Sequence, residues 1–393
     1  MKKKNQYSFC IVTYETFPNP ITQNLKTFLL QNYDCNILYI AHPMLDLGEG
    51  FKMSSKYDLL KKGGNKYGNA YHWRIYWPFL YIKDIIYTLY WIIKLNMKFD
   101  IYFACGNLNP IAGLILRKFK IVKKVVYQSI DYYPSRYENK LLDWVYFQLD
   151  KFCVKYCDET WNVTDNIAKA REEKMGMKRE VYNKQYVVPG GVWFHKTKRL
   201  PFSKINTKKI VYRGMLFHYM GVDLAIKAMP SMLKKIPDLR FEIVGTGPES
   251  QRLKQEALDL GVEKQIIFHG FVKERKDVLE ILSDGALGIA TFNTKFSEKI
   301  KNSDPGKIKD YMLMGMPVIT TNAVYSSAEI AERKCGLVVD YNTDDFAQAV
   351  IDLLKDKEKL RIYRENAIKY IERFDCANIL KPNVERVLNE NTI

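Results

Sequence analysis

The residues best suited to chemistry lie in the stretch 302–322, NSDPGKIKDYMLMGMPVITTN. Pro305 and Gly306 stand where a helix is expected to begin, and Lys307 falls in its first turn. The first N–H groups of a helix have no partners within it and carry the positive end of its dipole, so they bind anions. A lysine at the same end is electrostatically unfavourable by itself. The stretch therefore predicts a phosphate-binding site.

Asp310 follows Lys307 by three residues and can face the same site, because residues three apart are neighbours on a helix. A carboxylate there can accept hydrogen bonds from the two hydroxyls of a ribose. The alternative is a solvated Lys307–Asp310 pair on a helix surface. Asp304 or Ser303 is the expected N-cap of this helix.

Two further stretches, IVYRGML and FEIVGTGPE, each combine a predicted strand with a terminal glycine. Gly214, Gly245 and Gly247 would allow backbone to approach a ligand closely at the carboxyl end of a parallel sheet. Neither stretch contains the G-x-G-x-x-G dinucleotide fingerprint. Ordinary turns are the alternative.

The elements that must position these residues follow an alternating strand and helix pattern. In the first half, YSFCIVTY, CNILYIAH, FDIYFAC and KKVVYQSID are predicted strands, and a helix is predicted in ITQNLKTFLLQNY. The second half repeats the pattern from KKIVYRG to MPVITT. This order predicts an α/β protein with two doubly wound, parallel-sheet units. The last segment is predicted to be helical, with a break near Phe374 to Asn378.

Length and composition agree with a folded, two-domain protein. The chain has 393 residues, of which 47% are hydrophobic and 27% charged, so disorder is not expected. The net charge of +17 is concentrated in residues 1–195, which hold 28 Lys and Arg against 17 Asp and Glu. Such a field attracts nucleic acid, anionic lipid or phosphorylated small molecules alike. The start of the chain lacks the apolar core of a signal peptide, so a cytoplasmic protein is expected.

The cysteines and histidines indicate neither a disulfide framework nor a metal site. The seven cysteines lack a C-x-x-C pair and most lie in apolar stretches, so they are predicted to be buried thiols in a reducing compartment. The five histidines are isolated, without the spacing of zinc ligands.

An aromatic stretch at 76–98, YWPFLYIKDIIYTLYWIIKLNMK, is nearly long enough to cross a bilayer. Lys83 and Asp84 interrupt it early, so a spanning helix is not expected. It is either a buried crossover helix or a helix that lies in the membrane interface.

Three stretches of the second half resemble the C-terminal domain of GT-B glycosyltransferases, notably the retaining bacterial enzymes of family four: YRGMLFHYMGVDLAIKAM, FEIVGTGPESQRLKQEALDLGVEKQIIFHGFV and PGKIKDYMLMGMPVITT. The resemblance implies two Rossmann-like domains facing each other across a cleft, with the acceptor site on the first and the nucleotide-sugar site on the second. It implies no metal and no cofactor, the nucleotide diphosphate sugar being the donor substrate.

The resemblance and the pattern together give a domain assignment. Residues 1–190 are expected to form the acceptor-binding domain, 191–207 a linker rich in Pro, Gly and basic residues, and 208–372 the nucleotide-sugar-binding domain. Residues 373–393 are expected to form a helix that returns to the first domain.

Three positions depart from the family pattern. The two cations that usually hold the donor diphosphate are replaced by Met215 and Met220. The usual pair of glutamates falls on Asn302 and Asp310, of which only Asp310 retains a carboxylate. Diphosphate binding would then depend on Lys307 and the helix start, with Arg213, beside the missing arginine, as a candidate third ligand. Whether the enzyme retains or inverts the anomeric configuration is left open.

The resemblance and the residue types together indicate a set of donor-site residues, of which the resemblance itself implies Gly214, Gly245, Gly247, Phe271, Val272 and Asp310. Phe271 and Val272 would lie by the base, and Asp310 would hold the ribose. His218 could reach a donor phosphate or have a surface or turn role. Arg213 is either a diphosphate ligand or a structural partner at a strand end. The full expected donor site is Arg213, Gly214, His218, Gly245, Gly247, Phe271, Val272, Pro305, Gly306, Lys307 and Asp310.

Lys307 and Asp131 are the expected catalytic residues. In an inverting enzyme Asp131, at the end of a predicted strand in the first half, could remove the proton of the acceptor. In a retaining enzyme it would orient the acceptor, and a turn or helix-cap role is the alternative.

The function expected from these features is that of a metal-independent hexosyltransferase. It would move a sugar from a nucleotide diphosphate sugar to a lipid-linked or polysaccharide acceptor in bacterial surface glycan synthesis. It would bind the anionic inner face of the cell membrane peripherally. Alternatives are a GT-B sugar-nucleotide epimerase and a non-catalytic partner subunit. Nucleic acid is not an expected partner, because the basic residues are dispersed and no binding motif is present.

Overall fold

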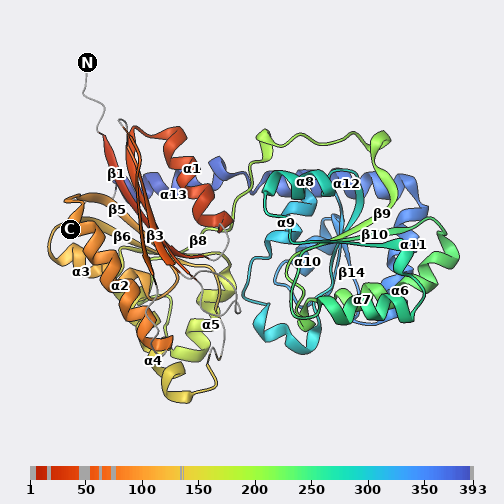
Figure 1. The fold of residues 1–393 in the computed structure, drawn as a ribbon, viewed down its shortest axis with the longest axis horizontal. Coiled ribbons are helices and arrows are strands. Elements are labelled where there is room, and N and C mark those ends of the chain that lie inside the picture. The colour runs from red at the N-terminus through yellow and green to blue at the C-terminus, as the bar shows by residue number, and fades with distance from the viewer. Residues whose placement is uncertain are drawn as a thin grey trace. The chain divides into compact units, whose positions relative to one another are not determined.

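A computed structural model describes residues 6–15, 19–43, 54–61, 64–71, 77–132, 135 and 137–389. The chain divides into two compact units (Figure 1). Unit 1 comprises Met1–Gly191 and Cys376–Ile393, and unit 2 comprises Val192–Asp375. Each unit is built on a largely parallel sheet with helices, which confirms the predicted α/β class.

In unit 1, eight strands within the described residues form one sheet in the order β4-β3-β2-β1-β5-β6-β7-β8. The central strands are apolar and buried, as expected for a parallel sheet covered on both faces. β3 and β4 pair antiparallel at one edge, a hairpin that the sequence analysis did not foresee. The strands are β1 (Tyr7–Tyr14), β2 (Cys35–His42), β3 (Ser54–Leu60), β4 (Lys66–Tyr71), β5 (Phe99–Cys105), β6 (Val122–Ser129), β7 (Glu159–Asn162) and β8 (Gln185–Val187).

The helices of unit 1 lie on the two faces of this sheet. α2 (Trp77–Lys94), α3 (Asn109–Lys118) and α4 (Lys140–Tyr156) pack into a common core on one face (Figure 1). α1 (Pro20–Asn32) contacts the C-terminal helix α13 (Cys376–Asn389) on the other. The remaining helix, α5, spans Asp165–Met175. All seven cysteines are buried and none forms a disulfide, as predicted.

Unit 2 has six parallel strands within the described residues, in the order β11-β10-β9-β12-β13-β14. The order reverses direction between β9 and β12, which is where ligands bind in sheets of this kind. The strands are β9 (Asn206–Arg213), β10 (Arg240–Val244), β11 (Ile266–Gly270), β12 (Gly285–Ala290), β13 (Val318–Thr320) and β14 (Gly336–Val338). The helices are α6 (Val222–Lys235), α7 (Ser250–Asp259), α8 (Arg275–Leu282), α9 (Gly306–Leu313), α10 (Ser327–Glu332), α11 (Thr343–Lys355) and α12 (Lys357–Glu372).

Residues 192–207, expected as part of a linker, belong to unit 2. They form two short 3-10 turns, and the Arg199 guanidinium donates a hydrogen bond to the carbonyl of Leu313 at 2.6 Å. This segment therefore packs against the end of α9.

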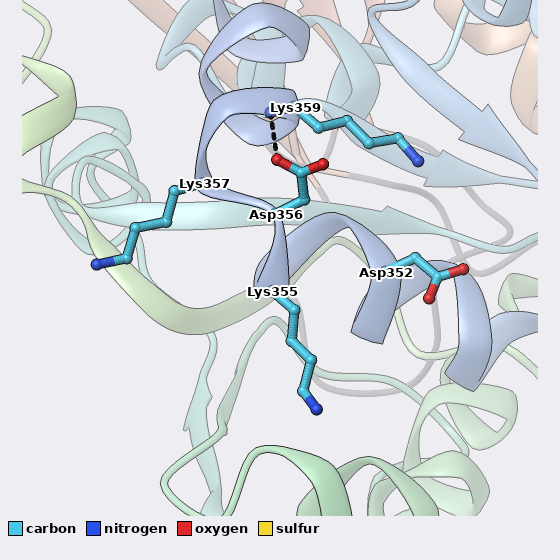
Figure 2. A pocket seen from close by; sticks show the side chains of 5 residues that line it. All are labelled: Asp352, Lys355, Asp356, Lys357 and Lys359. Atoms are coloured by element: carbon cyan, nitrogen blue, oxygen red, sulfur yellow. Dashed lines mark hydrogen bonds between the residues drawn. The ribbon is translucent and has the colours of Figure 1, made fainter.

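The C-terminal helical segment is broken twice. One break, at residues 373–375, matches the expected position near Phe374. The other is at Asp356, whose side chain caps α12 by accepting a hydrogen bond from the backbone N–H of Lys359 (Figure 2). A surface depression at this junction is lined by two aspartates and three lysines. The lysine side chains point away from one another, so they do not converge on a ligand. Within the described part of the chain, no helix has both the length and the hydropathy needed to cross a bilayer.

Candidate functional site

The loops after β9 and β10 interlock at the carboxyl edge of the unit 2 sheet. The N–H of Gly214 donates to the carbonyl of Val244 at 2.9 Å, and the N–H of Leu216 donates to that of Thr246 at 3.0 Å. A Cβ on Gly245, where φ is +140°, would lie 1.9 Å from the oxygen of Gly214. This glycine therefore makes room for the neighbouring loop.

The three glycines of these loops were expected to let the backbone approach a ligand, but in the structure the groups next to them belong to the protein itself. A Cβ on Gly247 would lie 2.5 Å from the oxygen of Leu216, so its space too is filled by protein backbone. A Cβ on Gly214, where φ is +144°, would lie 3.1 Å from Cε of Lys307. The lack of a side chain at Gly214 therefore lets Lys307, the predicted phosphate-binding lysine, lie close to the backbone.

Lys307 is buried, with 7% of its surface exposed. Its ammonium donates to the hydroxyl oxygen of Tyr212 at 2.9 Å and lies over the rings of Tyr212 and Phe292, at 4.2 and 4.9 Å from their centroids. Among the described residues, no carboxylate forms an ion pair with it. Burial, together with the nearby guanidinium of Arg213, holds the pKa of Lys307 well below its ordinary value.

The start of α9 differs from the prediction. Pro305 occupies the N-cap position, and no side chain caps the helix. Asp304 instead pairs with Lys309 at 2.5 Å, so neither Asp304 nor Ser303 acts as the N-cap. Among the described residues, the backbone N–H groups of Gly306 and Lys307 have no hydrogen-bond acceptor. The helix start thus keeps two donors available for an anion.

Tyr311 ties α9 to the sheet. Its hydroxyl accepts a hydrogen bond from the backbone N–H of Arg213 at 2.7 Å and donates one to the carbonyl of Ile289 at 3.0 Å. A Cβ on Gly288 would lie 2.2 Å from the Tyr311 ring, so only glycine at this point of β12 leaves space for it. These contacts hold the helix start beside the end of β9.

Asp310 lies between two arginines. Its carboxylate is buried and contacts the guanidinium of Arg275 at 2.6 Å and that of Arg213 at 3.3 Å. In this structure Arg213 is therefore an ion-pair partner, and both carboxylate oxygens of Asp310 accept hydrogen bonds from Arg275. Its role as a ribose ligand stays a prediction.

Arg275 is the residue of this cluster that the sequence analysis did not single out. It is the first residue of α8, which is as unfavourable for a cation as the position of Lys307. The same electrostatic argument could have identified Arg275 from the sequence. When Lys307 is protonated, it carries together with Arg213 and Arg275 three positive charges against the one negative charge of Asp310, which favours an anionic ligand.

Of the two methionines that replace the expected cations, Met220 contacts Lys307 and Met215 contacts Tyr212, the hydrogen-bond partner of Lys307. The sulfur of Met220 is 3.4 Å from the Lys307 ammonium, and the carbonyl of Met215 accepts a hydrogen bond from the Tyr212 hydroxyl at 2.7 Å. Because Tyr212 donates to Met215, its oxygen is left to accept from Lys307. These residues help to hold the lysine in place.

The remaining expected donor residues lie at the rim of the same edge. His218 is exposed, and its ring packs on that of Phe296 with the centroids 4.7 Å apart. Phe271 and Val272 directly follow β11, at the edge of the sheet, and the Phe271 side chain is exposed. Asn302 is buried.

Asp131 belongs to unit 1 and follows β6 at the carboxyl edge of its sheet. Burial raises the pKa of Cys105, at the end of β5, to about 12, and the carboxylates of Asp131 and Glu15 act in the same direction. Glu15 directly follows β1 and accepts hydrogen bonds from the Tyr39 hydroxyl and the Asn19 N–H. It is a second carboxylate at this edge that the sequence analysis did not name, although its place after a strand could have indicated it.

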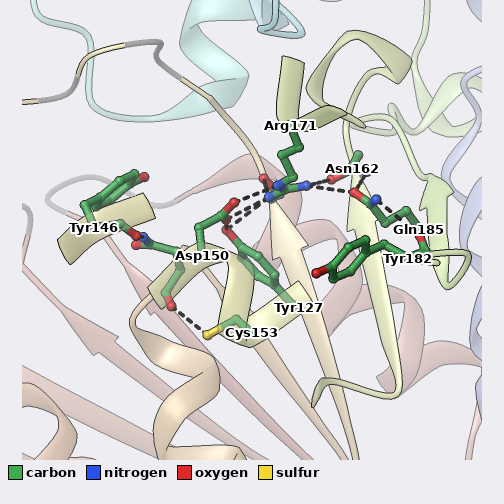
Figure 3. A network of polar contacts seen from close by, with 10 residues as sticks. Tyr127, Tyr146, Asp150, Cys153, Asn162, Arg171, Tyr182 and Gln185 are labelled. Carbon is green, nitrogen blue, oxygen red and sulfur yellow. Dashed lines mark hydrogen bonds and ion pairs between the residues drawn. The ribbon is translucent and has the colours of Figure 1, made fainter. Parts of the chain in front are cut away.

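A buried arginine, Arg171, anchors the ends of two strands of the unit 1 sheet (Figure 3). Arg171 contacts Asp150 through two hydrogen bonds of 2.7 and 2.9 Å, and it donates to Asn162 at 2.6 Å and to Ser129 at 3.0 Å. Ser129 and Asn162 are the last residues of β6 and β7. The network thus links two strand ends to α4 and α5.

Comparison with known proteins shows which family model and which proteins this chain is similar to. The family model described as "Glycosyl transferases group 1" matches residues 196–370. The chain is 24% identical over 191 residues to an uncharacterized glycosyltransferase of Haemophilus influenzae, covering 48% of this chain and 49% of that one. It is 24% identical over 159 residues to the poly(glycerol-phosphate) alpha-glucosyltransferase of Bacillus subtilis, with 40% of this chain and 22% of the relative covered.

A third relative is the GDP-mannose-dependent alpha-(1-6)-phosphatidylinositol monomannoside mannosyltransferase of Mycolicibacterium smegmatis, 28% identical over 156 residues, with 38% of this chain and 39% of the relative covered. The chain thus spans half or less of these relatives. Among solved structures, Anabaena HepE in complex with UDP matches at a TM-score of 0.66 and 15% identity, covering 97% of this chain and 99% of that one. Sucrose-phosphate synthase from Thermosynechococcus elongatus matches at a TM-score of 0.67 and 12% identity, with the same coverage.

Proposed function

Residues 196–370 form a group 1 glycosyltransferase domain within a GT-B fold, and from this premise we propose that the chain transfers a sugar from a nucleotide diphosphate sugar to a lipid-linked or polysaccharide acceptor. The observation that carries the proposal is the buried Lys307, which has no carboxylate partner among the described residues and lies at the uncapped start of α9. A diphosphate is the ligand that would satisfy both.

The chemistry proposed for Lys307 is stabilisation of the leaving group. In the transfer, the bond between the anomeric carbon and the diphosphate oxygen breaks, and a bond to the acceptor oxygen forms. Negative charge develops on the diphosphate as it leaves. A buried ammonium and two oriented N–H groups act strongly on such a charge, because little water screens them.

Arg213 is placed to join Lys307 when the donor binds. Its side chain is partly exposed, and its contact to Asp310 is long, at 3.3 Å. Asp310 would keep its shorter contact to Arg275 if Arg213 turned to a phosphate. We therefore assign Arg213 as a second diphosphate ligand. The acceptor proton would pass to Asp131 in an inverting reaction.

The proposed acceptor is supported by the names of the relatives. One is named for poly(glycerol-phosphate) and another for a phosphatidylinositol mannoside. Both are acceptors of the polymeric or lipid-linked kind. We propose that this chain acts in bacterial surface glycan synthesis and binds the inner face of the cell membrane peripherally.

The first test is a thermal-shift screen of the chain against UDP-, GDP-, ADP- and CMP-sugars. A ligand at a hundred times its dissociation constant adds about 2.7 kcal/mol to stability, which is readily detected. The shift should be absent in Lys307→Met and present in Lys234→Met, which removes an exposed cation from α6. An equal shift in both variants would refute the role of Lys307. In a separate incubation with the nucleotide sugar alone, conversion of the donor without an acceptor would indicate an epimerase.

A further inference from the structure

Helix α2 buries three polar residues beside the apolar Leu80, Trp91 and Ile92, and it exposes a stripe of apolar residues on its outer side. Lys83, Asp84 and Thr88 are 0–1% exposed. The residues at positions 79, 82, 86, 90 and 93 repeat at helical spacing and form one outward stripe, each with 48–63% of its surface exposed. These outward residues are Phe79, Ile82, Ile86, Tyr90 and Ile93. A surface helix of a soluble domain normally has the opposite arrangement.

A buried polar cluster fixes this orientation. His42, the last residue of β2, hydrogen-bonds through Nε2 to the Thr88 hydroxyl and through Nδ1 to the Ser55 hydroxyl, each at 2.8 Å. Lys83 contacts the carboxylate of Asp84 at 2.6 Å and donates to Ser55 at 3.0 Å. Rotating α2 to bury its apolar stripe would break these bonds and leave polar groups on the sheet without partners, which is costly.

The neighbouring helices extend the apolar stripe. α3 presents Ile115 and Phe119 near its C-terminal end, and α4 presents five large apolar side chains, of which Trp144 is 59% exposed. α2, α3 and α4 pack side by side on the same face of the sheet. We call this surface the α2–α4 face. Its exposed apolar residues are the five of α2 together with Ile115, Phe119, Leu141, Trp144, Val145, Phe152 and Tyr156.

The fully exposed charges in this part of the chain are mostly positive, while Asp100, which pairs with Lys123, Asp131 and Asp143 are partly exposed. Among the described residues between 77 and 157, Glu138 is the only exposed carboxylate. Two of the lysines lie against aromatic rings of the face: Lys94 over Tyr90 at 5.4 Å and Lys155 over Tyr156 at 5.3 Å. The exposed cations are Lys94, Lys98, Lys118, Lys120, Lys123, Lys140 and Lys155.

We infer that the α2–α4 face lies on an anionic lipid bilayer, with its apolar side chains among the acyl chains and its lysines at the headgroups. Aromatic, aliphatic and lysine side chains together are typical of surfaces at this depth. Anionic headgroups complement the excess of lysines. A second copy of the chain is disfavoured, because a symmetric dimer would place this lysine-rich surface against itself.

This inference deepens the proposed function, on which it rests for the lipid-linked acceptor. The full chain would be tested by flotation with vesicles of phosphatidylcholine and phosphatidylglycerol, and with vesicles of phosphatidylcholine alone. Binding is expected to the mixed vesicles and to weaken as salt is raised. The triple variant Ile82→Ser, Ile86→Ser, Ile93→Ser should bind roughly a hundredfold more weakly. Replacing Lys94, Lys118 or Lys155 by glutamine should weaken binding about fivefold each.

A matched control replaces three comparably exposed apolar residues of unit 2, as Leu258→Ser, Ile267→Ser, Ile362→Ser. It should float with the mixed vesicles as the unmodified chain does. Circular dichroism and nucleotide-sugar binding would show that both triple variants are folded. Because donor binding is measured apart from vesicle binding, a failure of the proposed function can be distinguished from a failure of this inference. No flotation of the unmodified chain, or equal flotation of the two triple variants, would overturn the inference. A dimer that only the α2 variant converts to monomers, without vesicle binding, would assign the face to a second copy.

Discussion

The ammonium of Lys307 lies 2.9 Å from the hydroxyl oxygen of Tyr212 and is surrounded by aromatic rings and a methionine sulfur. An aromatic face attracts a cation, but it compensates for the loss of water less well than a carboxylate does. The lysine is therefore held in place at a cost in stability. Such a cost is expected where a side chain serves a ligand.

Replacing Lys307 by methionine should stabilise the fold and abolish activity. Methionine fills a similar volume without a charge to desolvate, so the free energy of unfolding should rise by on the order of 1 kcal/mol. Turnover should fall at least about a hundredfold, because the leaving diphosphate loses its buried cation. Thermal unfolding and an assay of nucleoside diphosphate release measure the two effects. A less stable variant would show that Lys307 mainly holds the fold together.

Donor binding should depend on the protonation of Lys307. Its pKa is lowered in the free protein, so above that lowered value the side chain is neutral. A bound diphosphate favours the charged form, which means that binding takes up a proton and weakens as pH rises through the lowered pKa. Calorimetric titration in two buffers of different ionisation enthalpy measures the proton uptake. In Lys307→Met both the uptake and this pH dependence should be lost.

The free energy of unfolding of the unligated protein should rise with pH, whereas donor binding weakens. Because the pKa of Lys307 is lower in the folded than in the unfolded chain, the unfolded chain binds more protons between the two values. Stability from this group therefore rises with pH across that window. Denaturant titration at several pH values, compared between the unmodified chain and Lys307→Met, isolates the contribution. Identical slopes in the two proteins would mean that the side chain is fully hydrated in the folded state.

Gly245→Ala should disrupt the interlocked loops. The added Cβ would lie 1.9 Å from the Gly214 oxygen, and φ at this position is +140°. A loss of about 3 kcal/mol or more is expected, together with loss of donor binding, because the loop that carries Gly214 must move. Gly306→Ala is the control for stability, since its added Cβ would meet nothing within 4 Å. Chemical denaturation of both variants gives the comparison.

Arg171→Met should be among the most damaging changes in unit 1. The guanidinium is fully buried, and its removal leaves the Asp150 carboxylate buried without its charged partner. The expected loss is about 3–5 kcal/mol. Arg361→Met, which removes an exposed arginine that pairs with two carboxylates on α12, should change stability by less than about 1 kcal/mol. Comparable losses in the two variants would contradict the buried-network interpretation.

Much of the site could be predicted from local sequence. The position of Lys307 at the start of a helix follows from Pro305 and Gly306, because proline favours the first positions of a helix. The alternation of strands and helices gave the fold class, since buried parallel strands read as apolar runs. The N-cap was wrong because the carboxylate of Asp304 has a stronger partner in the ammonium of Lys309.

Only the tertiary structure decided which residues far apart in the sequence become ion-pair or hydrogen-bond partners. Arg275 meets Asp310 across 35 residues, and His42 meets Thr88 across 46. The sequence shows that α2 is apolar on most sides but not which side is turned outward. That side is determined by hydrogen bonds to groups on β2 and β3, because a buried polar group must find its partner wherever the fold places it.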